Sequence, residues 1–235
     1  MASLVWGLEW RLALSKKREL ALRVLAPLAL VLVIATGPLP ALAGVATYAV
    51  FFIAFGHFGA ALPTLRDAET GITSRVVRGG VSPASYLMQR VAASSALALV
   101  ELLPATLVAA AFLNASTAEI LIALGALAVG IWIASLLGVM AAAASRSRTE
   151  LAVICGVGLI LLFHMSGVFQ SPSAGGPAAT LEGVAPFRAV HEAFVTMVAG
   201  GAVRGAAAAL VWALALSTVV WLLAPRLTAA LGRSG

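Results

Sequence analysis

Long apolar stretches make up most of the chain, and short polar segments separate them. A helix that crosses a bilayer core of about 30 Å needs about 20 apolar residues, because each residue adds about 1.5 Å. Six windows of that kind carry few charges: residues 24–42, 45–63, 90–112, 118–144, 151–170 and 205–224. The pattern therefore predicts an all-α fold, a polytopic membrane protein with six transmembrane helices in a single transmembrane domain over residues 1–235.

Residues 3–22, ahead of the first window, mix Leu and Trp with Arg, Lys and Glu. Trp6 and Trp10 suit the level of the lipid headgroups, and Lys16 and Lys17 suit the water beside it. We predict an N-terminal interfacial helix here. A polar segment that only leads into the first span is the plainer interpretation.

A secretory signal is a further alternative for this region. The apolar run 24–35 follows a basic segment and precedes the small-residue sequence Ala-Leu-Ala at 41–43. Whether residues 1–43 are ever cleaved stays open, and N-terminal sequencing of the purified protein distinguishes the two cases.

The segment 64–89 predicts a helix, a break and a second helix. Asp67 and Glu69 open it, and the apolar positions that follow share one helical face. These positions are Ile72, Val76 and Val77. The paired glycines at 79–80 end the first helix, and the Ser-Pro pair at 82–83 supplies a cap and a first residue for the next.

The segment 171–204 predicts a short amphipathic helix that begins at Pro186. Its apolar face consists of Phe187, Val190, Phe194 and Met197. Arg188 and Glu192 fall on other faces. Because the stretch is too short and too charged to span a bilayer, we expect a re-entrant element that dips into the interface or caps the bundle.

The fourth window carries small residues at four-residue spacing, which allow two helices to approach closely. They are Gly130, Ala134, Gly138 and Ala142. Gly201 and Gly205 repeat the spacing before the last window. We expect close helix packing at these positions.

Composition excludes a soluble domain. The chain is 62% hydrophobic and 10% charged, with a mean hydropathy of +1.05, so polar groups are too few to cover a water-exposed surface. The net charge of +6 fits contact with anionic lipid headgroups. Because no basic patch is interleaved with aromatic residues, we expect the lipid bilayer as a partner and no nucleic acid.

Basic residues orient the predicted spans, because Lys and Arg concentrate on the cytoplasmic side of a membrane. Thirteen of the fifteen fall on one side, and only Arg188 and Arg204 fall on the other. The segment 64–89 is then a cytoplasmic loop and 171–204 an external one. We predict a multi-pass protein of the cell inner (plasma) membrane with both termini in the cytoplasm.

Motifs for catalysis are missing. No GxxxxGK[ST] sequence is present to cradle a nucleotide phosphate. His191 and Glu192 begin an HExxH-like string, but Val195 takes the place of the second imidazole that zinc requires. The single Cys155 lies within the fifth window. We expect no catalytic residue, no metal site and no cofactor bound by this chain.

Three ionisable residues inside the windows are candidates for a transport pathway or a protomer interface. Glu101 lies near mid-membrane, where a charge costs about 2.5–3.5 kcal/mol, so it must be protonated, paired or facing a polar cavity. His57 lies nearer the inner face and His164 in the outer half. At these depths the three do not form one compact site, and a histidine bonded to backbone is the plainer interpretation.

The order of these segments resembles the membrane subunit, or permease, of the type-2 ABC transporters. Members of that family have an interfacial helix, six spans, a coupling helix between spans two and three, and an external re-entrant element before span six. The most similar strings are DAETG at 67–71 and VSP at 81–83, with Tyr86-Leu87 and Arg90 leading into the third span. VAPFRAVHEAF at 184–194 resembles the external element, although the external segment is short.

The resemblance implies half of a pore, completed by a second permease copy or a homologous permease. It implies ATPase subunits on separate chains, which bind ATP and magnesium, and no enzyme activity in this chain. The coupling residues would be Asp67, Glu69, Gly71, Ile72, Arg75 and Arg78, and the external element would include Pro186, Phe187 and Glu192. The family mostly exports, and the apolar interior favours a hydrophobic or amphiphilic substrate.

A proton-coupled secondary transporter or an integral-membrane enzyme is the alternative. Such a carrier would use Glu101 as a relay and would show inverted repeats and broken spans. The halves show no convincing repeat, and Pro104 gives one mid-span break. A structural assembly subunit is a third class. Co-purification of an ATPase with this chain would favour the permease.

Overall fold

The computed structural model of the protein describes residues 4–36, 41–166, 185–199, 203 and 205–232. Every regular element in these residues is an α-helix, which confirms the predicted class there. In chain order the helices are α1 (Leu4–Ser15), α2 (Lys17–Thr36), α3 (Ala41–Glu69), α4 (Ile72–Arg78), α5 (Pro83–Phe112), α6 (Thr117–Ala144), α7 (Arg148–Met165), α9 (Arg188–Ala199) and α10 (Ala206–Leu231).

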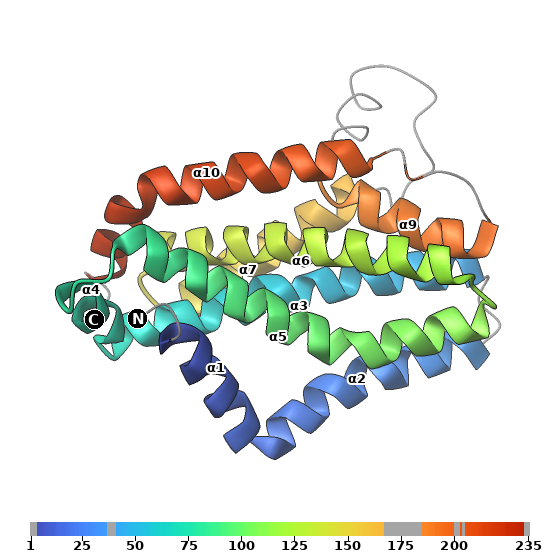
Figure 1. The fold of residues 1–235 in the computed structure, drawn as a ribbon, viewed down its shortest axis with the longest axis horizontal. Helices are drawn as coiled ribbons and strands as arrows, with labels where there is room; N and C mark the ends of the chain where they lie inside the picture. Colours follow the sequence, from blue (N-terminus) through green and yellow to red (C-terminus); the bar gives the residue numbers. More distant parts are fainter. Residues whose placement is uncertain (1–3, 37–40, 167–184, 200–202, 204, 233–235) are drawn as a thin grey trace.

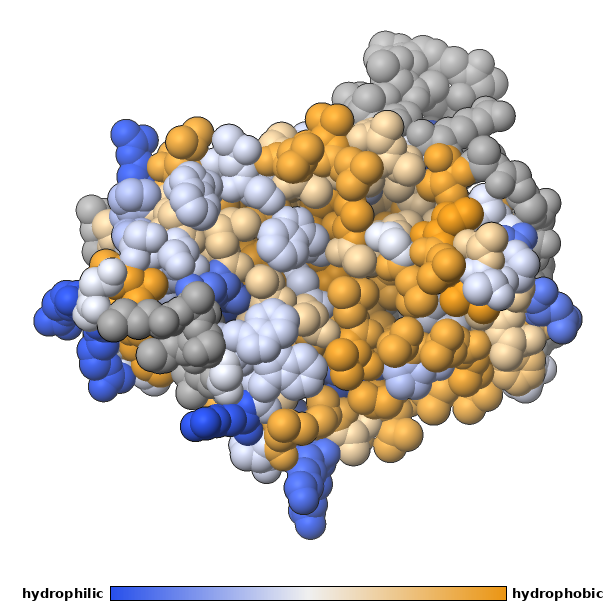
Figure 2. Space-filling model, in the orientation of Figure 1, coloured by the Kyte–Doolittle hydropathy of each residue, from blue (hydrophilic) through white to orange (hydrophobic). Residues whose placement is uncertain are grey.

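The long helices form a bundle with two distinct ends. Helices α3, α5, α6, α7 and α10 run along the long axis, and α6 contacts the other four (Figure 1). Helix α4 lies at one end, together with the beginning of α1 and the end of α10, whereas α9 lies at the opposite end (Figure 1). Figure 2 shows strongly hydrophilic residues gathered at the α4 end and hydrophobic residues covering much of the remaining face.

Three of the described helices are long and apolar enough to cross a membrane, namely α5, α6 and α10. They hold nearly all of the predicted windows 90–112, 118–144 and 205–224. The windows 24–42, 45–63 and 151–170 fall largely in α2, α3 and α7. The six-span topology stays a prediction, and residues 37–40 and 167–170 of those windows lie outside the described residues.

The N-terminal helix is shorter than predicted. Helix α1 stops at Ser15 and α2 begins at Lys17, so residues 17–22 belong to the helix of the first predicted span. The Ser15 hydroxyl donates to the Leu12 carbonyl at 2.9 Å, and a side-chain bond of this kind competes with the helical ladder. The bend sends α1 and α2 in different directions, and both contact α5 (Figure 1).

Helix α3 extends further than predicted, through Pro63 to Glu69. Pro63 cannot donate a backbone hydrogen bond to the carbonyl one turn earlier, yet α3 continues past it, with the Thr64 hydroxyl donating to the Ala60 carbonyl at 2.7 Å. The prediction that Asp67 and Glu69 open a loop at residue 64 is therefore wrong. They lie in the last turn of α3, and the connection to α4 is only the turn that follows.

The helix, break, helix pattern predicted for residues 64–89 is present, with its first helix shorter than the segment allowed. Helix α4 covers Ile72–Arg78, and the glycines at 79–80 follow it. The Ser82 hydroxyl accepts a hydrogen bond from the backbone N–H three residues on at 3.2 Å, and Pro83 opens α5. The mid-span break expected at Pro104 is wrong, because α5 continues through it with α2, α6 and α10 packed alongside.

The small-residue stripe of α6 is closely packed, as predicted, and its neighbours lie on α3 and α9. Gly130, Ala134, Gly138 and Ala142 are all buried. A Cβ atom added at Gly138 would overlap the backbone carbonyl oxygen of His57. The two helix backbones are therefore in direct contact, which only a glycine at this position permits.

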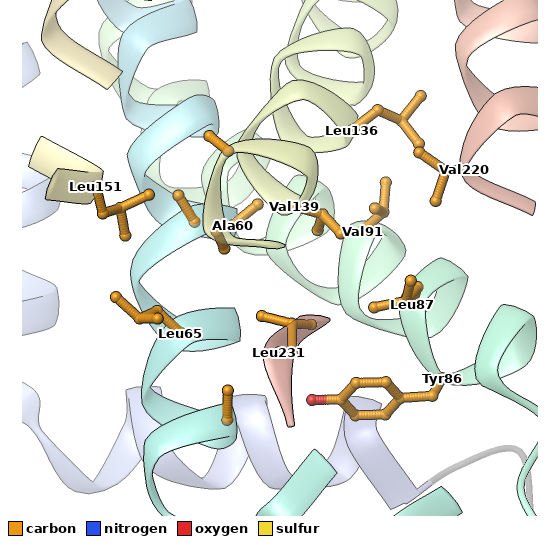
Figure 3. Packing of buried hydrophobic residues seen from close by; sticks show 14 of the residues in the cluster. Ala60, Leu65, Tyr86, Leu87, Val91, Leu136, Val139, Leu151, Val220 and Leu231 are labelled. Carbon is orange, nitrogen blue, oxygen red and sulfur yellow. The ribbon is translucent and has the colours of Figure 1, made fainter. Parts of the chain in front are cut away.

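Two buried apolar clusters fill the bundle. One lies toward α9 and includes Ile53, Leu102, Leu127, Ile131 and Phe194. The other lies toward α4 and joins α3, α5, α6, α7 and α10 through side chains such as Leu65, Tyr86, Leu87, Val139 and Leu231 (Figure 3). The second cluster therefore ties the end of α10 to the helices on either side of α4.

Helix α9 begins at Arg188, two residues later than the start predicted at Pro186. The reason is a turn closed by the Arg188 N–H and the Ala185 carbonyl at 3.2 Å, which contains Pro186 and Phe187. Phe187, Val190 and Phe194 are buried, as the predicted apolar face requires, and α9 packs against α3 and α6. The side chain of Met197 and residues 171–184 lie outside the described residues.

Candidate functional site

A buried cluster of charged side chains lies at the α4 end of the bundle. Arg90, in the second turn of α5, has no exposed surface. Its guanidinium forms ion pairs with Glu9 of α1 and with Asp67 of α3. Arg66 also contacts these two carboxylates, at 3.1 Å to Glu9 and 3.0 Å to Asp67. We call these four residues the buried ion cluster.

The charges in the buried ion cluster balance, with two guanidinium groups and two carboxylates. Asp67 is fully buried, and Glu9 is 7% exposed. Removing charges from water is costly, and only close pairing offsets that cost. The cluster therefore holds α1, α3 and α5 in a fixed relation, because any separation would leave a buried charge without its partner.

Tyr86 connects the buried ion cluster to α4. Its hydroxyl lies 3.3 Å from an Asp67 carboxylate oxygen and 3.1 Å from the hydroxyl of Thr73. Tyr86 and Thr73 are both buried. Figure 3 shows the Tyr86 ring among the apolar side chains that join the helices at this end. Hydrogen bonds through Tyr86 thus link α4 to α3, and ion pairs link α3 and α5 to α1.

The residues predicted to couple this chain to an ATPase divide into buried and exposed ones. Asp67 is buried, and its carboxylate contacts Arg90, Arg66 and Tyr86, so it presents no exposed charge at this end of the bundle. Glu69 is partly exposed and pairs with Arg148 at the start of α7, at 2.6 Å.

The other predicted coupling residues lie in α4 or at its N-terminal end. Arg75 and Arg78 are exposed and bond to nearby backbone oxygens, of Thr70 at 3.0 Å and of Ser74 at 3.3 Å. Ile72 is half-buried at the first position of the helix. Gly71 has a φ of 68°, in the left-handed region that favours glycine.

The candidates for a transport pathway do not form one site. Glu101 is 6% exposed and lies 3.5 Å from Arg23 of α2. The ring of His57 is buried, with Nδ1 3.1 Å from the Ala134 carbonyl oxygen. His164 lies in the last turn of α7, and its side chain is not among those described. Among the described side chains, Glu101 and His57 share no hydrogen bond, since Glu101 contacts Arg23 and His57 the Ala134 carbonyl.

The predicted external element joins α9 to α10. One carboxylate oxygen of Glu192 accepts from Arg188 at 2.9 Å, and the other accepts from the backbone N–H of Gly205 at 2.9 Å. Gly205 is the N-cap of α10, where a negative charge is favourable. Burial lowers the pKa of the neighbouring His191. The described residues contain no group of His, Cys, Asp or Glu able to hold a metal ion.

Sequence reasoning missed the buried ion cluster. The sequence pattern places Arg66 in the predicted loop and Arg90 at the start of the third window, both as orienting charges. Both instead lie on helices, and Arg90 is inaccessible to water. The available signal was Glu9, a lone carboxylate among the Leu and Trp residues of the first helix. A buried acid needs a basic partner, but the sequence does not say which of the following basic residues supplies it.

The described residues form an all-helical bundle, and three of its helices are long and apolar enough to cross a bilayer. A short helix, attached through buried charges, closes one end. Such a bundle is typical of a polytopic membrane protein. The family model of ABC-2 type transporters matches residues 3–199. The chain therefore belongs to the ABC-2 type transporter family, as the membrane permease component of an ABC transporter. A comparison with curated proteins finds no matching relative.

Proposed function

We propose that this chain is the membrane subunit of an ATP-driven exporter, powered by ATPase subunits on separate chains that bind ATP and magnesium. Two permeases, either two copies or two homologues, enclose the substrate path. The protein lies in the cell inner membrane with its termini and α4 on the cytoplasmic side. The mostly apolar interior supports a hydrophobic or amphiphilic substrate.

The observation that carries this proposal is the attachment of α4. An ATPase subunit that pushes on α4 acts on a helix tied through Thr73 and Tyr86 to Asp67, and through Asp67 and Arg90 to Glu9. Arg75 and Arg78 remain exposed on α4, and Glu69 stands beside it. We assign to these three side chains the contact with the ATPase, and to Asp67 the transmission of the movement.

A pair of substitutions at Gly71 tests the coupling role. Valine does not tolerate the left-handed conformation at this position, whereas asparagine adopts it more readily. In vesicles holding the permease with its co-purified ATPase, Gly71→Val should leave ATP hydrolysis intact but lower transport per ATP at least about tenfold, because α4 is displaced by a strained turn. Gly71→Asn should keep most of the coupling.

Reversal of the partly exposed Glu69 charge beside α4 provides a second test. Glu69→Lys should reduce both the amount of ATPase that co-purifies and the transport, while membrane insertion stays normal. If Gly71→Val and Glu69→Lys both transport like the wild type, α4 is not the coupling helix. If no ATPase accompanies the wild-type chain under mild purification, the ATP-driven mechanism itself is wrong.

A further inference from the structure

A cavity of about 250 Å³ lies between α1, α2, α3 and α5, beside the bend that joins α1 to α2. Its charged lining consists of Glu9, Lys16, Glu19, Arg23 and Glu101. Apolar side chains, including Leu20, Phe58 and Leu97, complete the walls. Apart from Glu9, none of these residues takes part in the coupling proposed above.

Two polar side chains of the cavity wall could accept hydrogen bonds beyond those that the protein itself supplies. The Ser94 hydroxyl lines it, is buried with its residue 5% exposed, and has no hydrogen-bond partner. Glu101 stands two helical turns further along the same face of α5, and its contact with Arg23 is long, at 3.5 Å. The α5 wall therefore offers two buried acceptors that a ligand with N–H groups would satisfy.

The opposite charges stand at the rim. Lys16 is exposed and Arg23 is half-buried, and both pair with Glu19, at 3.1 Å and 2.6 Å. Exposed pairs of this kind contribute little and exchange partners readily. A phosphate that entered the cavity would meet a guanidinium and an ammonium at the bend, while its own cationic group reached Glu101.

We propose that this cavity binds the headgroup of a zwitterionic phospholipid with a primary ammonium, of which phosphatidylethanolamine is the simplest example. The ammonium donates to Glu101 and Ser94, and the phosphate contacts Lys16 and Arg23. The volume suits a headgroup, because pockets that bury a whole drug-sized molecule measure about 300–1,000 Å³. The acyl chains lie outside the cavity, against exposed leucines that flank it: Leu22, Leu25 and Leu62.

The chemistry of the walls discriminates between lipids. A quaternary ammonium, as in phosphatidylcholine, has no N–H to donate to Glu101 or Ser94. An anionic lipid such as phosphatidylglycerol has a phosphate for Lys16 and Arg23 but places no cation against the Glu101 carboxylate. The site therefore prefers phosphatidylethanolamine over both.

Native mass spectrometry tests the preference without any ATPase, so its outcome is independent of the transport proposal. The purified chain is reconstituted in nanodiscs with equal parts of the three lipids and released by collision. Phosphatidylethanolamine should be retained at least about tenfold over phosphatidylcholine, as expected for hydrogen bonds to a charged group. Equal retention of the three lipids would overturn the proposal.

Substitutions at two glycines form a matched pair, of which one fills the cavity and the other leaves it unchanged. Gly59 lines it, and a Cβ added there meets no atom within 4 Å; the same is true of Gly125 on α6, which is not part of the lining. Gly59→Leu should abolish the preference, and Gly125→Leu should keep it. Both changes raise helix propensity, so both chains should fold.

A second set of variants removes the hydrogen-bond acceptors Glu101 and Ser94. Glu101→Gln and Ser94→Ala should each reduce retained phosphatidylethanolamine, with phosphatidylcholine unchanged, whereas the exposed Thr218→Ala on α10 should have no effect. Selective retention that survives Gly59→Leu and Glu101→Gln would place the lipid elsewhere and refute the site. A preference lost equally in Gly125→Leu would refute it too, because that change does not touch the cavity.

Discussion

At the scale of single residues, Arg90 is the side chain on which the α4 end depends most. It is fully buried and pairs with Glu9 and Asp67. Arg90→Met should destabilise the protein by about 3–5 kcal/mol, because it leaves two buried carboxylates with the half-exposed Arg66 as their cationic partner. Thermal unfolding of the purified protein in detergent measures the loss.

Two comparisons separate this effect from a loss of packing. Arg78→Met removes an exposed guanidinium at the same end and should change stability by no more than about 0.5 kcal/mol. Adding Glu9→Gln and Asp67→Asn to Arg90→Met removes the stranded charges and should recover part of the stability. If the single and triple variants unfold alike, the buried ion cluster does not act through charge.

Residue-level chemistry was the part of the site least predictable from sequence. The sequence shows Arg90 near a span end, where basic residues normally face water, and nothing local signals that a carboxylate from the first helix reaches it. The pairing joins residues 81 positions apart, so only the folded chain reveals it. The start of α5 was easier to predict, because Ser82 caps this helix and Pro83 is its first residue, so both signals are local.

At the scale of helices, the contact of α3 with α6 sets the spacing of the bundle. Gly138→Ala should prevent correct packing, because the added methyl group overlaps the His57 carbonyl oxygen, which belongs to a helix backbone and cannot turn aside. We expect a loss of at least about 2 kcal/mol, in the range of overpacked cores. The monodisperse fraction in size-exclusion chromatography and the unfolding temperature both report it.

Gly125→Ala on the same helix is the matched control. A Cβ there meets nothing within 4 Å, so the change should be neutral or stabilise α6 by up to about 1 kcal/mol through helix propensity. Equal behaviour of the two alanine variants would show that α3 and α6 tolerate a wider separation than their backbones adopt.

Helix boundaries show why the elements were predictable only in part. Windows of apolar residues located α5, α6 and α10 well, since length and hydropathy are properties of the segment itself. The end of α3 was not found, because α3 continues beyond its apolar window into the charged segment 66–69. The bend at Lys16 was not found either, because hydropathy does not register the side-chain bond that Ser15 makes there.

At the scale of the whole molecule, the two ends of the bundle differ in what they contain. The α4 end gathers the described starts and ends of α1 and α10 with the buried ion cluster, while α9 packs into the other end (Figure 1). The distribution of Lys and Arg predicted this two-ended organisation, since basic residues that orient spans must collect on one side. Which end faces the cytoplasm is a prediction that the fold alone does not test.

Cysteine labelling in whole cells tests the orientation. With the buried Cys155 replaced by alanine, cysteines are introduced at Arg146, beside α7 and the α4 end, and at Ala118, in the first turn of α6 at the opposite end. Both positions are exposed, so access to them is limited by the membrane. A membrane-impermeant maleimide should label Ala118→Cys in intact cells or spheroplasts, and Arg146→Cys only after the membrane is opened.

The opposite pattern would place α4 outside the cell, where no ATP-hydrolysing subunit can act on it, and would contradict the coupling role together with the orientation. Labelling of both cysteines before permeabilisation would mean that α6 does not separate two compartments. The expected pattern connects orientation with coupling. The basic residues that orient the chain keep α4 in the compartment that contains ATP. Two of them, Arg66 and Arg90, also belong to the buried ion cluster, which under the proposed function carries the movement of α4 to the membrane helices.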